Sequence, residues 1–306
     1  MCRLYALMAN EPTRVECSLV RSQNSLMRQS ESDAEGVEHA HGWGVADYTQ
    51  GGPLLDKQAW AAYHGEHFPR KAARVYARAV IAHVRRATVG RTSVENTHPF
   101  RYGRFTFAHN GTIPDFERVR QRMLAETDPL HRDAIRGETD SEHLFHYLLT
   151  LWSRGPQNDL PGTVRAGLER VLAWCHEIAP GKPVGLNIVL SDGEQMVASR
   201  FNRSLWYLCR DEFVRCCPDC GRPHVHHEPG AAYRAVEVAS EPVTPGEPWR
   251  PLPEASVLGV DAGFGLRIVP LRVPQESAPL NAHATLVASL PGHQRNAPRP
   301  AACTHP

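Results

Sequence analysis

The chain begins MCRLYALMAN at residues 1–10. A cysteine follows the initiator methionine. The mostly apolar run CRLYALMA predicts a first strand over residues 2–9. Removal of the methionine would make Cys2 the first residue. It is then either an ordinary small residue at the start of a strand, or a nucleophile whose base is its own freed α-amino group.

Composition limits the classes of protein to consider. The 306 residues are 42% hydrophobic and carry a formal net charge of +1, which allows one large domain or two modest ones. This balance predicts no nucleic-acid partner and no membrane-surface partner. No apolar run approaches the roughly 20 residues of a membrane span, and residues 1–20 lack a secretory signal. A cytoplasmic location is therefore expected, where eight cysteines indicate catalytic, metal-binding or buried thiols rather than disulfides.

Strand and helix patterns occur in blocks. Apolar residues at helical spacing predict helices over residues 14–27, 139–154 and 163–178, with Thr139 or Asp140 as the N-cap of the second. Short apolar runs predict strands over residues 42–48, 78–87, 105–110, 184–193, 195–201, 204–210, 233–240 and 255–261. Residues 88–104 are too polar for either element and predict an ordered loop. This order favours two sheets with helices outside them over a βαβ repeat.

Five short stretches contain the residues that are candidates for a functional site. They are MC at 1–2, HGWGVA at 41–46, HVRRATVG at 83–90, AHNGT at 108–112 and GETDSE at 137–142. Each alone has an ordinary structural explanation, such as a hairpin turn at Asn110-Gly111 or a helix cap at Asp140. Their occurrence together in this order needs a common explanation.

Together these stretches resemble the class II glutamine amidotransferase domain, a member of the N-terminal nucleophile hydrolases. The resemblance runs from Cys2 to at least Glu142, and residues 233–244 and 255–261 resemble the closing strands of the stand-alone members. It implies an α+β fold, a four-layer αββα sandwich of two antiparallel sheets between helical layers. We expect this domain to span residues 1–272, and the aperiodic Pro/Ala-rich residues 273–306 to form a disordered tail.

The resemblance also implies roles for individual residues. Cys2 would be the nucleophile, and its α-amino group, with a reference pKa of about 7.7–8.0, can take the thiol proton near neutral pH. Asn110 and Gly111 would form the oxyanion hole, although a simple Asn-Gly hairpin remains an alternative. Arg85 offers a planar fork for the α-carboxylate of glutamine.

The resemblance implies roles for two more residues of these stretches. Thr88 would add a contact to the substrate, and Asp140 would receive its α-ammonium group. Arg86 and Val89 depart from the synthetase-linked members, which often carry tryptophan and histidine there, and this leaves open how the glutamine loop closes.

Two further sets of residues have structural explanations. Residues 42–44, Gly-Trp-Gly, predict a strand beside the nucleophile, for which packing in the core is favoured over direct contact with the substrate. For His98 and His109, loop ordering and hydrogen bonding are favoured over catalysis, because the base is already supplied.

A second group of residues lies in a Cys/His-rich insertion at 209–230. CPDCG resembles one knuckle of a zinc ribbon, in which Cys217 and Cys220 would bind a structural zinc ion. The remaining ligands would come from Cys209, Cys216, His224, His226 and His227. The alternative is a reduced, metal-free hairpin. No cofactor is expected for catalysis.

The sequence therefore predicts an enzyme that cleaves the γ-amide of glutamine to glutamate and ammonia through a thioester. Hydrolysis of another γ-glutamyl amide or peptide is the alternative, and a separate synthase subunit could use the ammonia. A non-catalytic zinc-containing binding module is the third possibility.

Overall fold

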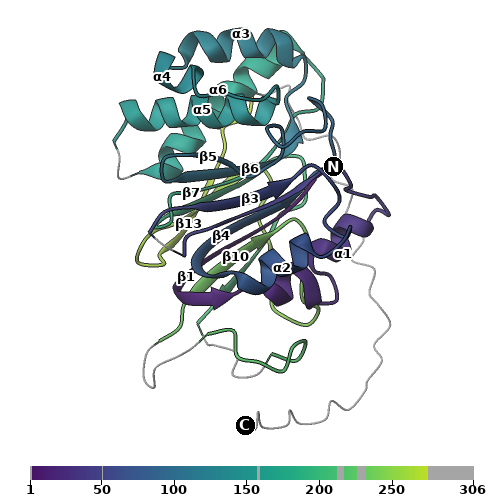
Figure 1. Cartoon of the computed structure of the whole chain (residues 1–306). Coiled ribbons are helices and arrows are strands. Elements are labelled where there is room, and N and C mark those ends of the chain that lie inside the picture. Colours follow the sequence, from purple (N-terminus) through teal and green to yellow (C-terminus); the bar gives the residue numbers. More distant parts are fainter. Residues whose placement is uncertain (1, 50, 157–158, 212–216, 226–231, 275–306) are drawn as a thin grey trace.

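The computed structural model describes residues 2–49, 51–156, 159–211, 217–225 and 232–274. In this part of the chain two antiparallel sheets pack face to face, with helices on both outer faces (Figure 1). The first sheet has the strand order β11-β9-β10-β1-β4-β2-β3. Its strands are β1 (Arg3–Arg14), β2 (Trp43–Asp47), β3 (Leu54–Gln58), β4 (Tyr76–Val84), β9 (Trp206–Arg210), β10 (Ala235–Ala239) and β11 (Arg250–Pro251).

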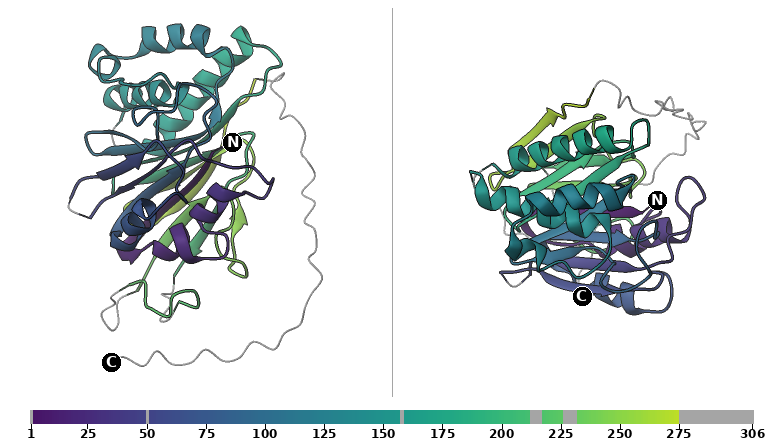
Figure 2. Two further views of the ribbon diagram at one scale, coloured as in Figure 1. Left: turned by 45° about the vertical axis from the view of Figure 1, so that its right-hand side comes forward. Right: turned by 90° about the horizontal axis from the view of Figure 1, so that it is seen from above.

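The second sheet has the order β13-β12-β8-β7-β6-β5. Its strands are β5 (Phe100–Tyr102), β6 (Phe105–Thr112), β7 (Gly185–Ser191), β8 (Met196–Arg200), β12 (Ser256–Val260) and β13 (Leu266–Pro270). Seen from above in Figure 2, the helices that follow β6 (teal) lie across this sheet. These helices are α3 (Phe116–Glu126), α4 (Pro129–Arg132), α5 (Asp140–Arg154) and α6 (Leu160–Ile178).

Three short helices cover the outer face of the first sheet (Figure 1). They are the π-helix η1 (Cys17–Arg21), α1 (Leu26–Glu31) and α2 (His67–Arg74). The chain thus forms the predicted four-layer αββα sandwich of the α+β class.

Strand β1 is buried on both faces, because successive side chains of a strand point to opposite sides. Leu4, Ala6 and Met8 enter the core between the two sheets. Tyr5 and Leu7 enter the core under η1, α1 and α2. The apolar run that opens the chain is therefore a central strand.

The helix predicted over residues 14–27 is wrong. Strand β1 continues to Arg14, and the helical residues are divided between η1 and α1. Ser22 is extended, with φ −60° and ψ 154°, and Ser25 caps α1 by accepting a bond from the Arg28 amide. Serines at both positions favour a break and a new cap over a continuous helix.

The structure decides two other expectations, on the start of α5 and on residues 88–104. Helix α5 begins as predicted, and Thr139 is its N-cap, accepting a bond from the Glu142 amide. The segment 88–104 is not wholly a loop, because residues 100–102 form the short strand β5 against β6. The predicted tail falls mostly on residues 275–306, outside the described residues. Within the described chain, no helix combines the length and the apolar character that a membrane span requires.

Several histidines are buried between the layers. Burial lowers the pKa of His83 to about 3, and it lowers that of His39 and of His146 to about 4 each. The His83 ring packs 4.3 Å from the His98 ring, and neither ring has a hydrogen-bond partner among the described residues. These rings are therefore neutral in the folded protein near neutral pH.

We predict that acid destabilises the fold through these rings. In the unfolded chain each pKa returns to about 6.5, so below that pH the unfolded state binds more protons and stability falls as the pH falls. His83→Phe keeps an apolar ring and removes one such group. Urea unfolding at about pH 7 and about pH 5 should show a smaller loss of stability for this variant than for the parent. An equal rescue by His64→Phe, at an exposed histidine, would contradict the assignment.

Candidate active site

Cys2 lies just before β1, beside the residues that follow β4. Arg3 pairs with Val84, and the Arg86 amide nitrogen lies 3.3 Å from the Cys2 sulfur, close enough to donate a hydrogen bond to it. Burial raises the pKa of the Cys2 thiol, while this amide and the positive charge of Arg85 oppose the rise. Strand pairing thus fixes where the sulfur stands.

Arg85 is buried and holds the loop that follows it. Its Nη2 atom donates to the carbonyl oxygens of Val89, at 2.9 Å, and Gly90, at 3.2 Å, and its Nη1 atom donates to that of Arg91, at 3.1 Å. Burial lowers the pKa of Arg85, and the charges of Cys2 and Asp140 oppose this shift. The guanidinium group therefore orders the loop in addition to carrying positive charge toward Cys2.

Asn110 is a buried amide on β6 without a partner. Its side chain is 1% exposed, and neither Nδ2 nor Oδ1 has a hydrogen bond to the described residues. Asn187 lies opposite Asn110 on β7, and both polar atoms of its side chain form hydrogen bonds. Its Oδ1 accepts from the Phe201 amide, and its Nδ2 donates to the Ser204 carbonyl. Buried polar groups are rarely left unpaired, so the Asn110 amide is available to a ligand.

Gly111 has no room for a side chain. A Cβ atom there would lie 2.0 Å from the Gly185 carbonyl oxygen. Both Asn110 and Gly111 pair with β7 inside the sheet, so the alternative that they form a hairpin turn is wrong.

Asp140 connects the start of α5 to the end of β6. Its Oδ2 accepts a bond of 2.8 Å from the Ile113 amide, and its Oδ1 accepts one of 2.9 Å from the Ser141 amide. A carboxylate is favourable in the first turn of a helix. Since Thr139 is the N-cap, the carboxylate of Asp140 serves to position the strand end and to bring negative charge to this edge.

Thr88 completes the set at the surface. It is exposed, and its Oγ1 lies 3.5 Å from the Oγ1 of Thr112 at the end of β6. The structure thus gathers the predicted residues at one edge, where β1 begins, β4 and β6 end, and α5 begins. His41 also belongs to this edge, because its Nδ1 accepts a 2.9 Å bond from the Ala87 amide. No role was predicted for His41, although it opens the HGWGVA stretch.

The two histidines set aside as structural differ from each other. His109 makes the expected hydrogen bonds, with its ring nitrogens 2.9 Å from the Ser141 hydroxyl and 2.9 Å from the Gly185 carbonyl. The prediction that His98 forms hydrogen bonds is wrong. Its ring nitrogens have no partner in the described chain, and the ring packs on His83.

The Gly-Trp-Gly strand has the expected role in the core. Trp43 is 1% exposed and packs edge-on against Phe68, with ring centroids 5.2 Å apart. A Cβ at Gly44 would lie 2.2 Å from the His98 carbonyl oxygen, so the small residue lets the loop before β5 approach.

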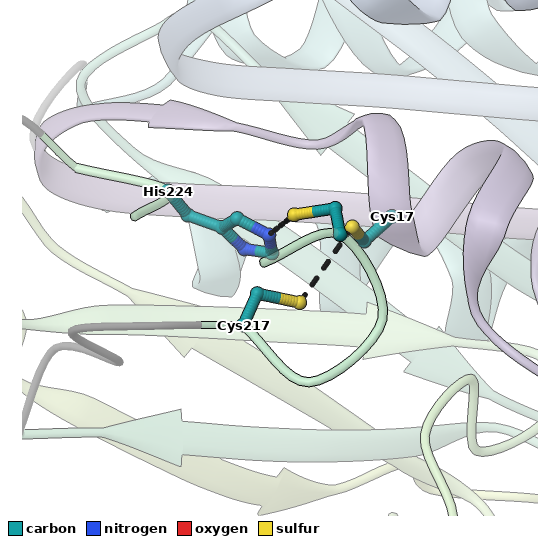
Figure 3. Close-up of side chains that lie close together, drawn as sticks. Cys17, Cys217 and His224 are labelled. Carbon is teal, nitrogen blue, oxygen red and sulfur yellow. Dashed lines mark hydrogen bonds between the residues drawn. The ribbon is translucent and has the colours of Figure 1, made fainter. Parts of the chain in front are cut away.

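The Cys/His-rich insertion is partly described. Cys217, Cys220 and His224 come together and are joined by Cys17 of η1, which the sequence analysis missed (Figure 3). Cys209 is exposed on β9 and lies outside this group. Cys216, His226 and His227 fall outside the described residues.

Comparison with known proteins identifies the family of this chain. The family model of class II glutamine amidotransferases matches residues 1–283. The chain belongs to this family. It is 29% identical to a Saccharomyces cerevisiae protein named "Probable glutamine amidotransferase DUG3", over 85% of this chain and 82% of that protein.

Solved structures show the same fold. A glutamine aminotransferase class-II domain protein from Silicibacter pomeroyi matches 89% of this chain and 100% of its own, with a TM-score of 0.60 and 21% identity. Glutamine phosphoribosylpyrophosphate amidotransferase from B. subtilis matches 89% of this chain and 50% of its own, with a TM-score of 0.57 and 17% identity. The fold is that of the N-terminal nucleophile hydrolases.

We predict that Asn110 contributes little to stability. Asn110→Ala removes an amide that makes no hydrogen bond to the described residues, so the free energy of unfolding should fall little or rise. Asn187→Ala leaves the Phe201 amide and the Ser204 carbonyl unpaired and should cost about 1–3 kcal/mol. Urea unfolding of both variants tests this, and equal losses would show that Asn110 is held by the protein itself.

Proposed function

We propose that the chain hydrolyses the γ-amide of glutamine, or of a related γ-glutamyl compound, through a thioester on Cys2. The observation that carries this proposal is the buried Asn110 amide, which lacks a partner in the described chain and lies at the edge that holds Cys2. A preorganised donor of this kind stabilises the negative charge that develops on a carboxamide oxygen.

The proposed reaction starts once Met1 has been removed. The α-amine of Cys2 takes the thiol proton, the thiolate attacks the amide carbon, and the oxyanion forms opposite the Asn110 Nδ2 group and the Gly111 amide. The amine then returns its proton to the departing nitrogen, which leaves as ammonia. Water attacks the resulting thioester and releases glutamate, so the balance is glutamine plus water to glutamate plus ammonia.

Recognition of the glutamyl group would use the two charged residues of this edge. Arg85 supplies positive charge for the α-carboxylate, and its loop brings Thr88 close to the end of β6. Asp140 supplies negative charge for the α-ammonium group. Because these residues contact only the glutamyl end, they do not discriminate among leaving groups, and larger γ-glutamyl compounds remain candidate substrates.

The fate of the ammonia separates the remaining alternatives. A plain hydrolase releases it, and an amidotransferase passes it to an acceptor bound by a partner synthase subunit. A panel of γ-glutamyl amides and peptides, assayed for glutamate release with and without candidate partner proteins, distinguishes the two.

The nucleophile can be tested by mass spectrometry. We expect Met1 to be absent from the mature protein, and the glutamine analogue diazo-oxo-norleucine to label Cys2. Cys2→Ser should remain folded and lose nearly all activity, because it removes the thiolate and no core contact. The exposed Cys209 is the internal control: a general alkylating reagent should label it and the analogue should not. Labelling at Cys217 or Cys220 by the analogue would contradict the mechanism, and full activity of Cys2→Ser would favour a binding module without catalysis.

Steady-state kinetics can divide the roles of the other residues. Asn110→Ala should lower kcat by about 10²–10³, as expected for one lost oxyanion donor. Asp140→Asn keeps the shape and loses the charge, and Arg85→Lys keeps the charge and loses the fork, so both should raise KM for glutamine. Equal effects of all three on kcat alone would show that the roles are wrongly divided.

A further inference from the structure

Four side chains from two distant parts of the sequence meet on the outer face of the first sheet. Cys17 is the first residue of η1, while Cys217, Cys220 and His224 belong to the connection between β9 and β10. Figure 3 shows the labelled Cys17, Cys217 and His224 turned toward one another across the gap between these segments. The four potential ligand atoms lie within 4.8 Å of one another.

Two of the distances between these atoms are close to those around a tetrahedral zinc ion. With bonds of about 2.3 Å to sulfur and about 2.0 Å to nitrogen, two thiolates would lie ~3.8 Å apart, and a thiolate and an imidazole nitrogen ~3.5 Å. The Cys17 and Cys217 sulfurs are 3.7 Å apart. The Cys220 sulfur is 3.6 Å from Nε2 of His224.

The turn that carries Cys217 and Cys220 has the backbone of a metal knuckle. The Gly221 amide donates a 2.8 Å bond to the Cys217 carbonyl, and Gly221 has a φ of 67°, which favours glycine. The Cys217 amide in turn donates a 3.1 Å bond to the Arg222 carbonyl. These two bonds close the turn that carries both cysteines of the CxxC pair.

The surroundings anchor both segments independently of a metal. The Arg14 amide donates a 2.8 Å bond to the His224 carbonyl, and the Ser22 hydroxyl donates to the Asp219 carboxylate. Cys17 and Cys217 are 3% and 5% exposed. The ligand positions are therefore largely preorganised, with Cys17 and Cys217 buried and Cys220 and His224 half-buried, in contrast to the exposed thiol of Cys209.

We propose that Cys17, Cys217, Cys220 and His224 bind one Zn²⁺ ion in a closed structural site. Binding would release the three thiol protons, and His224 would bind through its neutral Nε2. The protein fills all four tetrahedral positions, which leaves none for a reactive water. The ion would fasten the connection between β9 and β10 to η1, the segment that follows β1.

The site lies apart from the proposed nucleophile. Cys17 borders a cavity that Tyr5 and Leu7 line from the outer face of the first sheet, whereas the Cys2 sulfur contacts Arg86 at the strand edge. Metal binding therefore does not depend on the proposed glutamine chemistry, and either can fail without the other.

Metal analysis of freshly purified, reduced protein tests the proposal. We expect about one zinc per chain, and Co²⁺ exchanged into the site should give the intense absorption of a tetrahedral thiolate complex. Cys17→Ser is the decisive variant, because the CxxC motif alone gives no role to Cys17. It should lose most of the bound zinc and shift the cobalt spectrum.

Two cysteines provide matched controls. Cys175→Ser alters a buried thiol of α6 outside the group, and Cys209→Ser alters the exposed thiol on β9. Both variants should keep full zinc content. Zinc retained in Cys17→Ser, zinc lost in Cys209→Ser, or no zinc with a Cys17–Cys217 disulfide in its place would each overturn the proposal.

Chelation tests the structural role of the ion. Removal of zinc should increase hydrogen exchange in residues 217–225, while β6 keeps its protection and Cys2 still reacts with the glutamine analogue. Loss of Cys2 reactivity at the rate of zinc loss, with no change in exchange, would overturn a purely structural site.

Discussion

The pairing of β1 with β4 is the constraint on which the site depends. Strand β1 is buried on both faces, so its register cannot slip by one residue without exchanging the two cores that Leu4 and Tyr5 occupy. That register places Arg3 opposite Val84. Because Cys2 precedes Arg3 and Arg85 follows Val84, the pairing alone brings these two residues to the same end of the sheet.

Among the buried polar side chains of the site, all but one form hydrogen bonds to the described residues. Arg85 and Asp140 each hold a neighbouring segment through backbone bonds, and His109 is bonded at both ring nitrogens. Only the Asn110 amide, among these buried side chains of the site, lacks a partner in the described chain. The bonded groups make this edge rigid, and the free amide is the donor that we propose for the oxyanion.

The sequence predicted the four-layer fold and named residues that the structure brings to one edge, but it misjudged single elements. The resemblance of five short stretches to one family named Cys2, Arg85, Asn110 and Asp140, although each stretch alone has an ordinary structural explanation. The helix expected at 14–27 failed because helical spacing cannot show that Ser22 and Ser25 divide it. Cys17 could not be assigned at all, since its partner Cys217 is 200 positions away and only the folded chain brings them together.

We propose that a thioester on Cys2 is the intermediate that all substrates share. Hydroxylamine competes with water for such a thioester and converts it to the γ-glutamyl hydroxamate. The most direct measurement is the ratio of hydroxamate to glutamate formed from glutamine and from a γ-glutamyl anilide at one hydroxylamine concentration. We expect the same ratio for both substrates, because the leaving group has departed before water and hydroxylamine compete for the thioester. Different ratios, or glutamate release without any hydroxamate, would contradict it.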